Sequence, residues 1–216
     1  MRIAISSLLT ILLLVVSQVS AQETQELFKM IQPVAEKSLK NFSQLVTEEN
    51  YRQMGFKSPE EVNSAILGAP IQDFMVRLDR LKEYEPGSKP DELLTATSNV
   101  LYPVLEKEEV RSSITIAKTK DGWQAVSFGG PNFVKLVSST LIESSKVTGL
   151  DYSSYFMVRV PSLNLFFVAH YLDNELMFVP LMDNTRLKFR ARISMKAETV
   201  FSTILPDAKA HDGLPR

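Results

Sequence analysis

The short breaks between strand-like runs in the last third of the chain are the feature that most constrains its fold. Four such runs follow Gly149, and breaks of only a few residues separate them. The runs are Tyr155 to Val160, Leu163 to Leu172, Glu175 to Met182 and Arg186 to Ile193. Breaks this short join antiparallel neighbours, because a parallel pair needs a crossover of about a dozen residues. The sequence therefore predicts a C-terminal β-meander.

The second of these runs is apolar on both of the faces that a strand would present. Phe167 and Ala169 would point to one face, and Phe166 and Val168 to the other. Strands that read as continuous apolar runs are buried on both sides. We therefore expect a central strand here, with other elements covering both of its faces.

A β-hairpin is predicted from Arg111 to Phe128. Ile114 and Ile116 alternate with polar residues, and Lys120-Asp121-Gly122 supplies a turn in which glycine takes a positive φ. Gly129-Gly130-Pro131 then stops the return strand, and Asn132 is placed to cap a helix that continues through Ser145.

Other segments favour helices. Residues 24–50 have helical apolar spacing, with a kink or the start of a second helix expected at Pro33. Ser58-Pro59 resembles a helix start, and that helix is expected to end at Gly68. We further expect a strand over 71–84, a short helix over 88–99 and a closing helix over 195–205 that Pro206 ends.

The mixture of strands and helices lacks a regular βαβ rhythm. It predicts an α+β fold in which helices pack against a mainly antiparallel, curved sheet. Residues 22–206 are expected to form one domain, or two sub-lobes that meet near residues 146–152, with residues 207–216 as a flexible tail.

Residues 1–21 are typical of a secretory signal peptide. Arg2 precedes an apolar run from Ile3 to Val16, and Val19-Ser20-Ala21 offers small side chains for cleavage after Ala21. The alternative is a retained membrane anchor, although the run is shorter than the roughly 20 apolar residues that a spanning helix needs. Export without disulfides favours a bacterial protein of the periplasm or the extracellular space, with no integral membrane span after cleavage.

Composition excludes several classes of function. The chain has no cysteine and only two histidines, so we expect no cofactor, no thiolate chemistry and no multi-histidine metal site. The net charge of -1 argues against a nucleic-acid binder. That value hides an asymmetry: residues 22–110 hold 10 Lys/Arg against 16 Asp/Glu, and residues 111–216 hold 13 against 9.

The most distinctive charge pattern lies in the fourth strand-like run. Arg186, Lys188, Arg190 and Arg192 occupy every second position, which would place them on one face of a strand. Such a face can be a solvated edge that prevents aggregation. It can also be a docking surface for an anionic ligand, an acidic partner or lipid headgroups.

Two further groups of residues are candidates for a site. His170 could serve as an acid/base group, or it could point into a packed face. Trp123 and Tyr171 belong to a set of aromatic residues that could line an apolar pocket in a curved sheet or simply form the core.

No catalytic constellation is assembled in this sequence. We therefore expect an exported, non-catalytic protein that binds an unidentified protein or small ligand through the concave sheet or the basic strand face. The alternative is an exported hydrolase with His170 as general base, although no Gly-x-Ser-x-Gly motif accompanies it.

Overall fold

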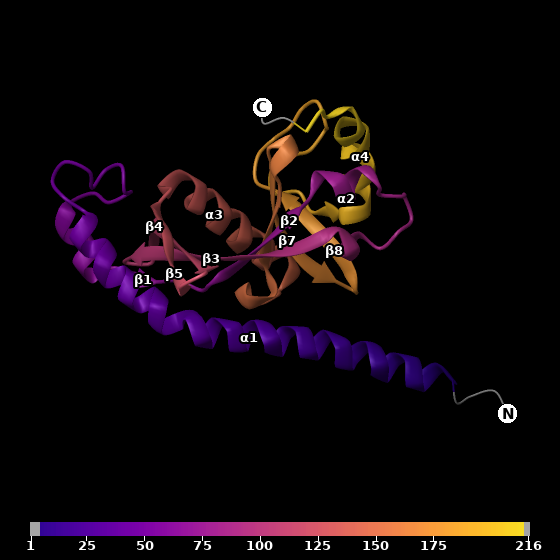
Figure 1. Ribbon diagram of the computed structural model, residues 1–216, viewed down its shortest axis with the longest axis horizontal. Helices are drawn as coiled ribbons and strands as arrows, with labels where there is room; N and C mark the ends of the chain where they lie inside the picture. Colours follow the sequence, from indigo (N-terminus) through magenta and orange to yellow (C-terminus); the bar gives the residue numbers. More distant parts are fainter. Residues whose placement is uncertain (1–4, 214–216) are drawn as a thin grey trace.

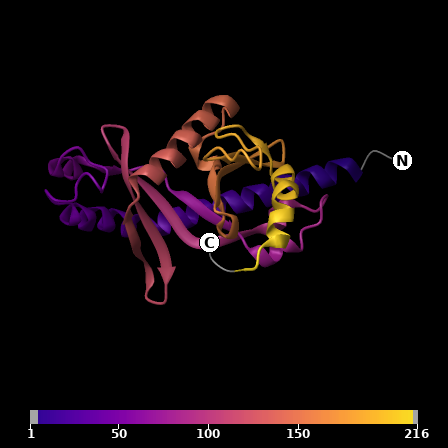
Figure 2. The same ribbon diagram turned by 90° about the horizontal axis from the view of Figure 1, so that it is seen from above.

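One nine-stranded sheet organises the protein (Figures 1 and 2). The computed structural model describes residues 5–213, with side chains from residue 24 onward. The strand order is β5-β4-β3-β2-β6-β7-β8-β9, and β1 also pairs with β3. Every strand pair is antiparallel except β2 with β6. The fold is therefore α+β with a mainly antiparallel sheet and helices packed against it.

The elements of the fold have the following bounds. The strands are β1 (Ile66–Leu67), β2 (Ile71–Val76), β3 (Leu94–Glu106), β4 (Glu109–Thr119), β5 (Gly122–Gly129), β6 (Phe156–Val160), β7 (Leu165–Leu172), β8 (Glu175–Pro180) and β9 (Met195–Lys196). The α-helices are α1 (Ile5–Leu45), α2 (Leu78–Lys82), α3 (Pro131–Thr148) and α4 (Ala197–Ala210). Four 3-10 turns complete the order: η1 (Pro59–Ser64), η2 (Pro90–Leu93), η3 (Tyr152–Ser154) and η4 (Pro161–Leu163).

Helices cover the centre of the sheet on both faces. On one face α1 packs over β4 and β5, while α2 and α4 pack over the meander strands. On the opposite face α3 crosses from β4 to β7. Leu101 and Val168 point toward α3, and their neighbours Tyr102 and Phe167 point to the other face.

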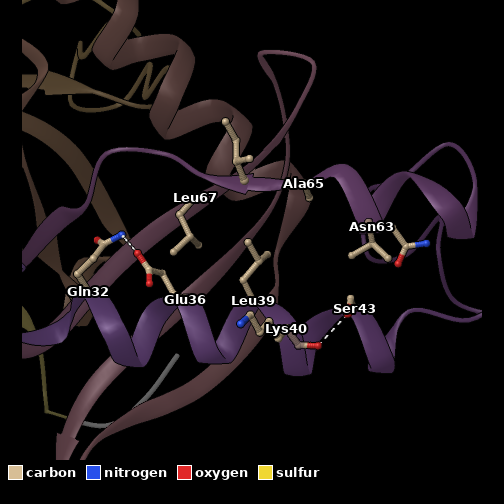
Figure 3. A pocket seen from close by; sticks show the side chains of 10 residues that line it. Gln32, Glu36, Leu39, Lys40, Ser43, Asn63, Ala65 and Leu67 are labelled. Atoms are coloured by element: carbon tan, nitrogen blue, oxygen red, sulfur yellow. Dashed lines mark hydrogen bonds between the residues drawn. The ribbon is translucent and has the colours of Figure 1, made fainter.

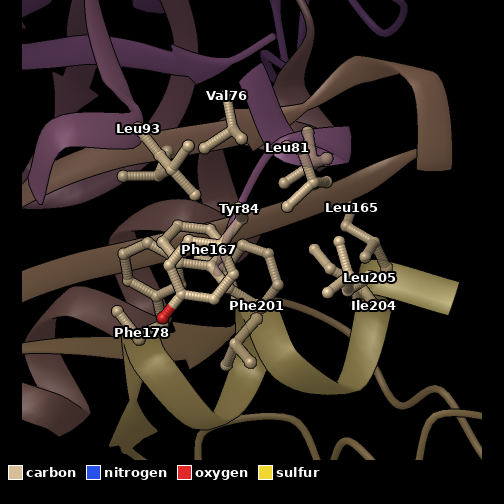
Figure 4. Close-up of a cluster of buried hydrophobic side chains, with 14 of the residues drawn as sticks. Val76, Leu81, Tyr84, Leu93, Leu165, Phe167, Phe178, Phe201, Ile204 and Leu205 are labelled. Carbon is tan, nitrogen blue, oxygen red and sulfur yellow. The ribbon is translucent and has the colours of Figure 1, made fainter. Parts of the chain in front are cut away.

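A cluster of aromatic rings holds α4 against the meander (Figure 4). Phe178 of β8 lies with its ring centroid 5.1 Å from that of Phe167 and 5.3 Å from that of Phe201 on α4. All three side chains are almost completely buried. Each such ring contributes roughly 2–3 kcal/mol through removal of apolar surface from water.

Local turn chemistry predicted several elements correctly. The hairpin of β4 and β5 is confirmed, and Gly122 in its turn has a φ of 102°. Helix α3 is confirmed and ends before Gly149, but it begins directly after Gly130, so Asn132 lies inside its first turn and the prediction of Asn132 as the cap is wrong. Strands β6, β7 and β8 form the expected meander, and β7 is buried on both faces.

The prediction of a strand over residues 186–193 is wrong. Lys188 and Arg192 have φ values of 58° and 65°, which a strand does not tolerate, and the segment is a turn-rich loop. The alternation of exposure is nevertheless real. Leu187 and Phe189 are buried, and Arg186, Lys188, Arg190 and Arg192 are exposed. The four cations therefore lie along a loop and not on one face of a strand.

Two expected helices are also corrected. Of the helix expected over 88–99, only the short 3-10 turn η2 is present. Residues from Leu94 onward pair with β2 and β4 as the long strand β3. The helix after Ser58 begins at Pro59 as predicted, but it is the short turn η1, and the chain then enters β1. The strand expected over 71–84 ends at Val76, and α2 follows it.

Both prolines that were expected to interrupt helices lie inside them. Helix α1 continues through Pro33, so no second helix begins there, and it bends along its length (Figure 1). Helix α4 continues through Pro206 to Ala210. Ala208 and His211 are buried, so residues 207–211 belong to the packed structure.

Only the backbone of residues 5–21 of the predicted signal peptide is described, as the first part of helix α1. Residues 1–4 are not described, and nothing beyond the backbone is described for residues 5–23. Among the residues whose side chains are described, no helix is both long and apolar enough to cross a membrane.

Candidate functional site

An open groove of about 500 Å³ lies between α1 and the segment that carries η1 and β1 (Figure 3). Ligand pockets typically occupy roughly 300–1,000 Å³, so the groove has room for a small molecule or a few residues of peptide. The residues that line it are Gln32, Glu36, Leu39, Lys40 and Ser43 on α1, and Val62, Asn63, Ala65, Ile66 and Leu67 opposite.

Helical periodicity assembles the first wall. Gln32, Glu36, Lys40 and Ser43 follow one another at three or four positions, so they share one face of α1. The adjacent face is apolar, and Ile31, Ala35 and Phe42 bury it in the core over β4 and β5. The polar stripe is therefore held beside the sheet by the packing of its own helix.

A network of charged side chains fixes the second wall. The buried Arg111 lies with Nη1 2.7 Å from Glu109 Oε2, Nε 3.7 Å from Glu61 Oε2, and Nη2 3.8 Å from Glu106 Oε2. Ser64 Oγ donates to Glu106 Oε1 over 3.4 Å. Because Glu61 and Ser64 belong to η1 while the other members lie on β3 and β4, the network ties η1 to the sheet.

The hydrogen bond from Lys57 and the charge of Arg111 lower the pKa of the exposed Glu109 carboxyl. Both cations favour the charged form of the carboxyl. The Glu109 carboxyl is therefore charged at neutral pH, as its pairs with Lys57 and Arg111 require.

Some polar groups of the groove have hydrogen-bond partners in the protein, and others have none among the described residues. Gln32 Nε2 donates to Glu36 Oε1 over 3.0 Å, and Ser43 Oγ donates to the Lys40 carbonyl oxygen over 2.7 Å (Figure 3). Neither the Lys40 ammonium nor the Asn63 side-chain amide has a hydrogen bond to any residue that the structure describes. A cation and an amide therefore remain free to bind a ligand.

Charge and apolar surface alternate within this small space. Glu36 and Lys40 stand one helical turn apart, and Leu39 and Leu67 lie between the two walls. The arrangement suits a ligand with a negative group, a positive group and a short apolar body.

In the described part of the chain, no group of three or more His, Cys, Asp or Glu side chains is placed to hold a metal ion.

His170, the residue considered as a general base, is completely buried on β7. Its ring centroid lies 5.0 Å from that of Tyr155. Neither ring nitrogen has a hydrogen-bond partner among the described residues, and burial lowers the pKa of the imidazole. The structure thus places His170 in the core, without access to a substrate.

Trp123 and Tyr171, which were considered as lining residues of one apolar pocket, lie apart in the structure. Trp123 lies on β5 and packs, partly buried, against the core beneath α1. Tyr171 lies on β7 with 44% of its surface exposed, and its ring contacts that of Phe156 at a centroid distance of 6.0 Å. These two residues therefore belong to different clusters on different parts of the sheet.

The four basic residues of the loop differ in their partners. Arg186 pairs with Asp207 at 2.6 Å, and Arg192 pairs with Glu143 of α3 at 2.8 Å. Lys188 and Arg190 have no ion pair with any described residue. None of the four reaches the groove, because the groove lies at the other end of the sheet.

Sequence reasoning did not identify the groove. The polar stripe on α1 was available as a signal, but a polar stripe is equally typical of a solvated helix face. Only the packing of η1 and β1 opposite the stripe turns it into one wall of a groove.

No protein-family model, curated protein or solved structure matches the chain.

Proposed function

We propose that this is an exported, non-catalytic binding protein whose groove between α1 and β1 holds a short zwitterionic ligand, with a short peptide as the best fit. The observation that carries the proposal is that two polar groups without a described partner, Lys40 on α1 and Asn63 on η1, line opposite walls of the groove that Glu36 also lines. Lys40 would bind a carboxylate, Glu36 would bind an ammonium group, and the Asn63 amide would add a hydrogen bond to the body of the ligand.

The location of the groove supports binding more than catalysis. Its walls bring together no nucleophile with an adjacent base, and His170 lies elsewhere in the core. Helices cover the centre of the sheet on both faces, which leaves the groove as a better place for a ligand than a concave sheet face.

Titration of the purified protein with small peptides tests the proposal. The probes are tetra-alanine with free ends, its N-acetylated form and its C-terminal amide, with affinity measured by calorimetry. The free peptide should bind, and blocking either end should weaken binding by about tenfold, because one charge-assisted hydrogen bond contributes roughly 1.5–3 kcal/mol.

Two substitutions assign the roles of the charged residues. Lys40→Ala should abolish the preference for a free carboxyl end, and Glu36→Gln should abolish the preference for a free amino end. Lys37→Ala is the matched control, since Lys37 is an exposed cation of the same helix that does not line the groove. Equal affinity for the three peptides, or an equal loss in the Lys37 variant, would contradict the proposal.

Export is a separate part of the proposal and rests on residues 1–21. N-terminal sequencing of protein expressed with its own leader should begin at Gln22. Recovery of an intact N-terminus on membranes would show that the segment is a retained anchor.

A further inference from the structure

We propose that the loop between β8 and β9, together with the C-terminal end of α3, forms a docking surface for an anionic lipid bilayer. This surface goes beyond the proposed function, because it shares no residue with the groove. We call it the loop–α3 surface, and its members are the exposed residues of the loop between positions 182 and 193 together with Glu143, Lys146 and Val147 of α3.

Exposed aliphatic side chains are the first observation. Val147 is 88% exposed, Ile193 57% and Met182 54%. Large apolar side chains that stand in water in one small area mark a contact surface more often than isolated ones do. Other exposed apolar residues exist on this chain, so these three mark a surface only where they lie together.

Hydrogen bonds bring the two ends of the loop side by side. The Arg192 amide donates to the Pro180 carbonyl oxygen over 3.0 Å, and the Ala191 amide donates to Asp183 Oδ1 over 2.8 Å. Residues 180–183 therefore run beside residues 191–193. This pairing places Met182 near Ile193, although they are distant in the loop.

Two contacts attach the loop to α3, and Figure 2 shows the loop beside the end of that helix. Leu181 packs in the same core cluster as Leu141. The Arg192 guanidinium pairs with Glu143, and Val147 follows Glu143 by one helical turn on the same face. Val147 thus lies on the side of α3 that carries the ion pair to Arg192, the residue before Ile193.

The charges of the loop–α3 surface favour an anionic partner. Two nearby carboxylates are ion-paired, Glu143 with Arg192 and the neighbouring Asp207 with Arg186. Asp183 accepts a hydrogen bond from a neutral backbone amide and keeps its charge. Lys146, Lys188 and Arg190 are exposed and have no ion pair with any described residue, so the cations of this area outnumber its carboxylates.

The combination points to a bilayer and away from an acidic protein. Protein interfaces concentrate aromatic residues in their centre and are depleted in lysine. Surfaces that bind lipid combine Lys and Arg, which attract anionic headgroups, with apolar side chains that enter the interface. The loop–α3 surface has aliphatic side chains interspersed among lysine and arginine.

Sedimentation with lipid vesicles tests this inference. The purified protein should bind phosphatidylcholine vesicles that contain about 30% phosphatidylglycerol and should not bind vesicles of phosphatidylcholine alone, since Lys and Arg residues near an anionic surface drive such binding. The double variant Lys188→Glu/Arg190→Glu should reduce partitioning by more than about tenfold. The matched control is Lys118→Glu/Lys120→Glu, in the β4–β5 hairpin away from the loop (Figures 1 and 2).

A second variant separates a bilayer from an acidic protein surface. Val147→Ser/Ile193→Ser keeps every charge and should still lower partitioning by roughly threefold or more, because apolar side chains enter the interface. Equal binding to both vesicle types, an equal loss in the control, or full binding by the serine variant would overturn the inference. Both substituted pairs are exposed, so unchanged circular dichroism should accompany the losses.

Discussion

Arg159 holds the buried carboxylate of Asp73 with two hydrogen bonds across the parallel pair of strands β2 and β6. Its Nε donates to Oδ1 over 2.9 Å, and its Nη2 donates to Oδ2. Thr97 Oγ1 donates a further hydrogen bond to Oδ2 over 3.0 Å. Asp73 is only 2% exposed, so Arg159 is the cation that compensates its charge in the middle of the sheet.

Removal of this cation should destabilise the fold strongly. Arg159→Ala leaves Asp73 buried and uncompensated, which costs about 3 kcal/mol. Arg77→Ala is the control, because the pair between Arg77 and Asp79 is exposed and such surface pairs contribute little to stability. Urea denaturation measures both variants, and a similar loss in the two would contradict the role of Arg159.

Gly55 and Gly87 offer a matched test of steric contact, because both have a φ of 97°. A Cβ atom on Gly55 would lie 1.9 Å from the Arg111 carbonyl oxygen, whereas one on Gly87 would meet nothing within 4 Å. Gly87→Ala should cost about 1–2 kcal/mol from backbone strain alone. Gly55→Ala should cost about 1–3 kcal/mol more, because the loop before η1 must move. Equal melting temperatures of the two variants would be inconsistent with this contact.

His170 should make the stability of the protein depend on pH. Burial lowers the pKa of this imidazole below the ordinary 6.5, so the unfolded chain binds a proton more readily than the folded chain does. As far as His170 determines it, the free energy of unfolding is therefore at its full value above about pH 6.5. It decreases as the pH falls toward the pKa of His170 in the folded protein.

The variant His170→Leu should flatten this dependence. Leucine removes the titrating group and the two unpartnered nitrogens. Thermal melts at a series of pH values between about 5 and 8 measure the effect. If the wild type and the variant lose stability equally on acidification, another group is responsible.

Tyr102 should be replaceable by phenylalanine without loss. Its hydroxyl is buried and has no hydrogen-bond partner among the described residues. Tyr102→Phe should therefore be neutral or stabilise the fold by about 1 kcal/mol at pH 7. A clear destabilisation at pH 7 would show that the hydroxyl has a partner in solution.

The same variant should resist alkaline unfolding. Burial, with a smaller contribution from the charge of Glu36, raises the pKa of Tyr102 from 10.0 to about 12. The unfolded chain therefore loses this proton first, and the wild type loses stability between pH 10.0 and about 12. Chemical denaturation in this range should show a smaller loss for the phenylalanine variant.

The elements predicted correctly are those that local chemistry determines. The β4–β5 hairpin depends on the turn at Gly122, and α3 depends on the Gly130-Pro131 junction. The meander follows from the shortness of its connections. In each case the residues that specify the structure are neighbours in sequence.

The errors arose where tertiary contacts outweigh local pattern. Strand β3 is buried on both faces near Tyr102, and it includes Pro103, so neither alternation nor propensity indicated a strand. The loop around Lys188 lies on the core and buries alternate side chains. The resulting alternation of apolar and basic residues in the sequence is the same as that of a strand. Pro206 is accommodated because α4 buries Leu205 and Ala208 on either side of it.

The candidate groove could be predicted only in part. The spacing of Glu36, Lys40 and Ser43 on one face of α1 is readable from the sequence. The opposite wall, with Asn63, depends on how η1 is tied to β3 and β4 through Arg111. That contact joins residues far apart in the chain, and no local signal reports it.

The single parallel strand pair among the described residues has a consequence for the order of folding. Strands β1–β5 are contiguous in sequence, as are β6–β9, and within each half neighbouring strands close through short hairpins or modest loops. The two halves of the sheet meet where Asp73 aligns with Met157, so their junction closes a loop that contains most of the first half. Closure of such a loop is slow compared with hairpin formation. We therefore expect the halves to acquire protection from hydrogen exchange early during refolding, and the β2–β6 amides to acquire it last.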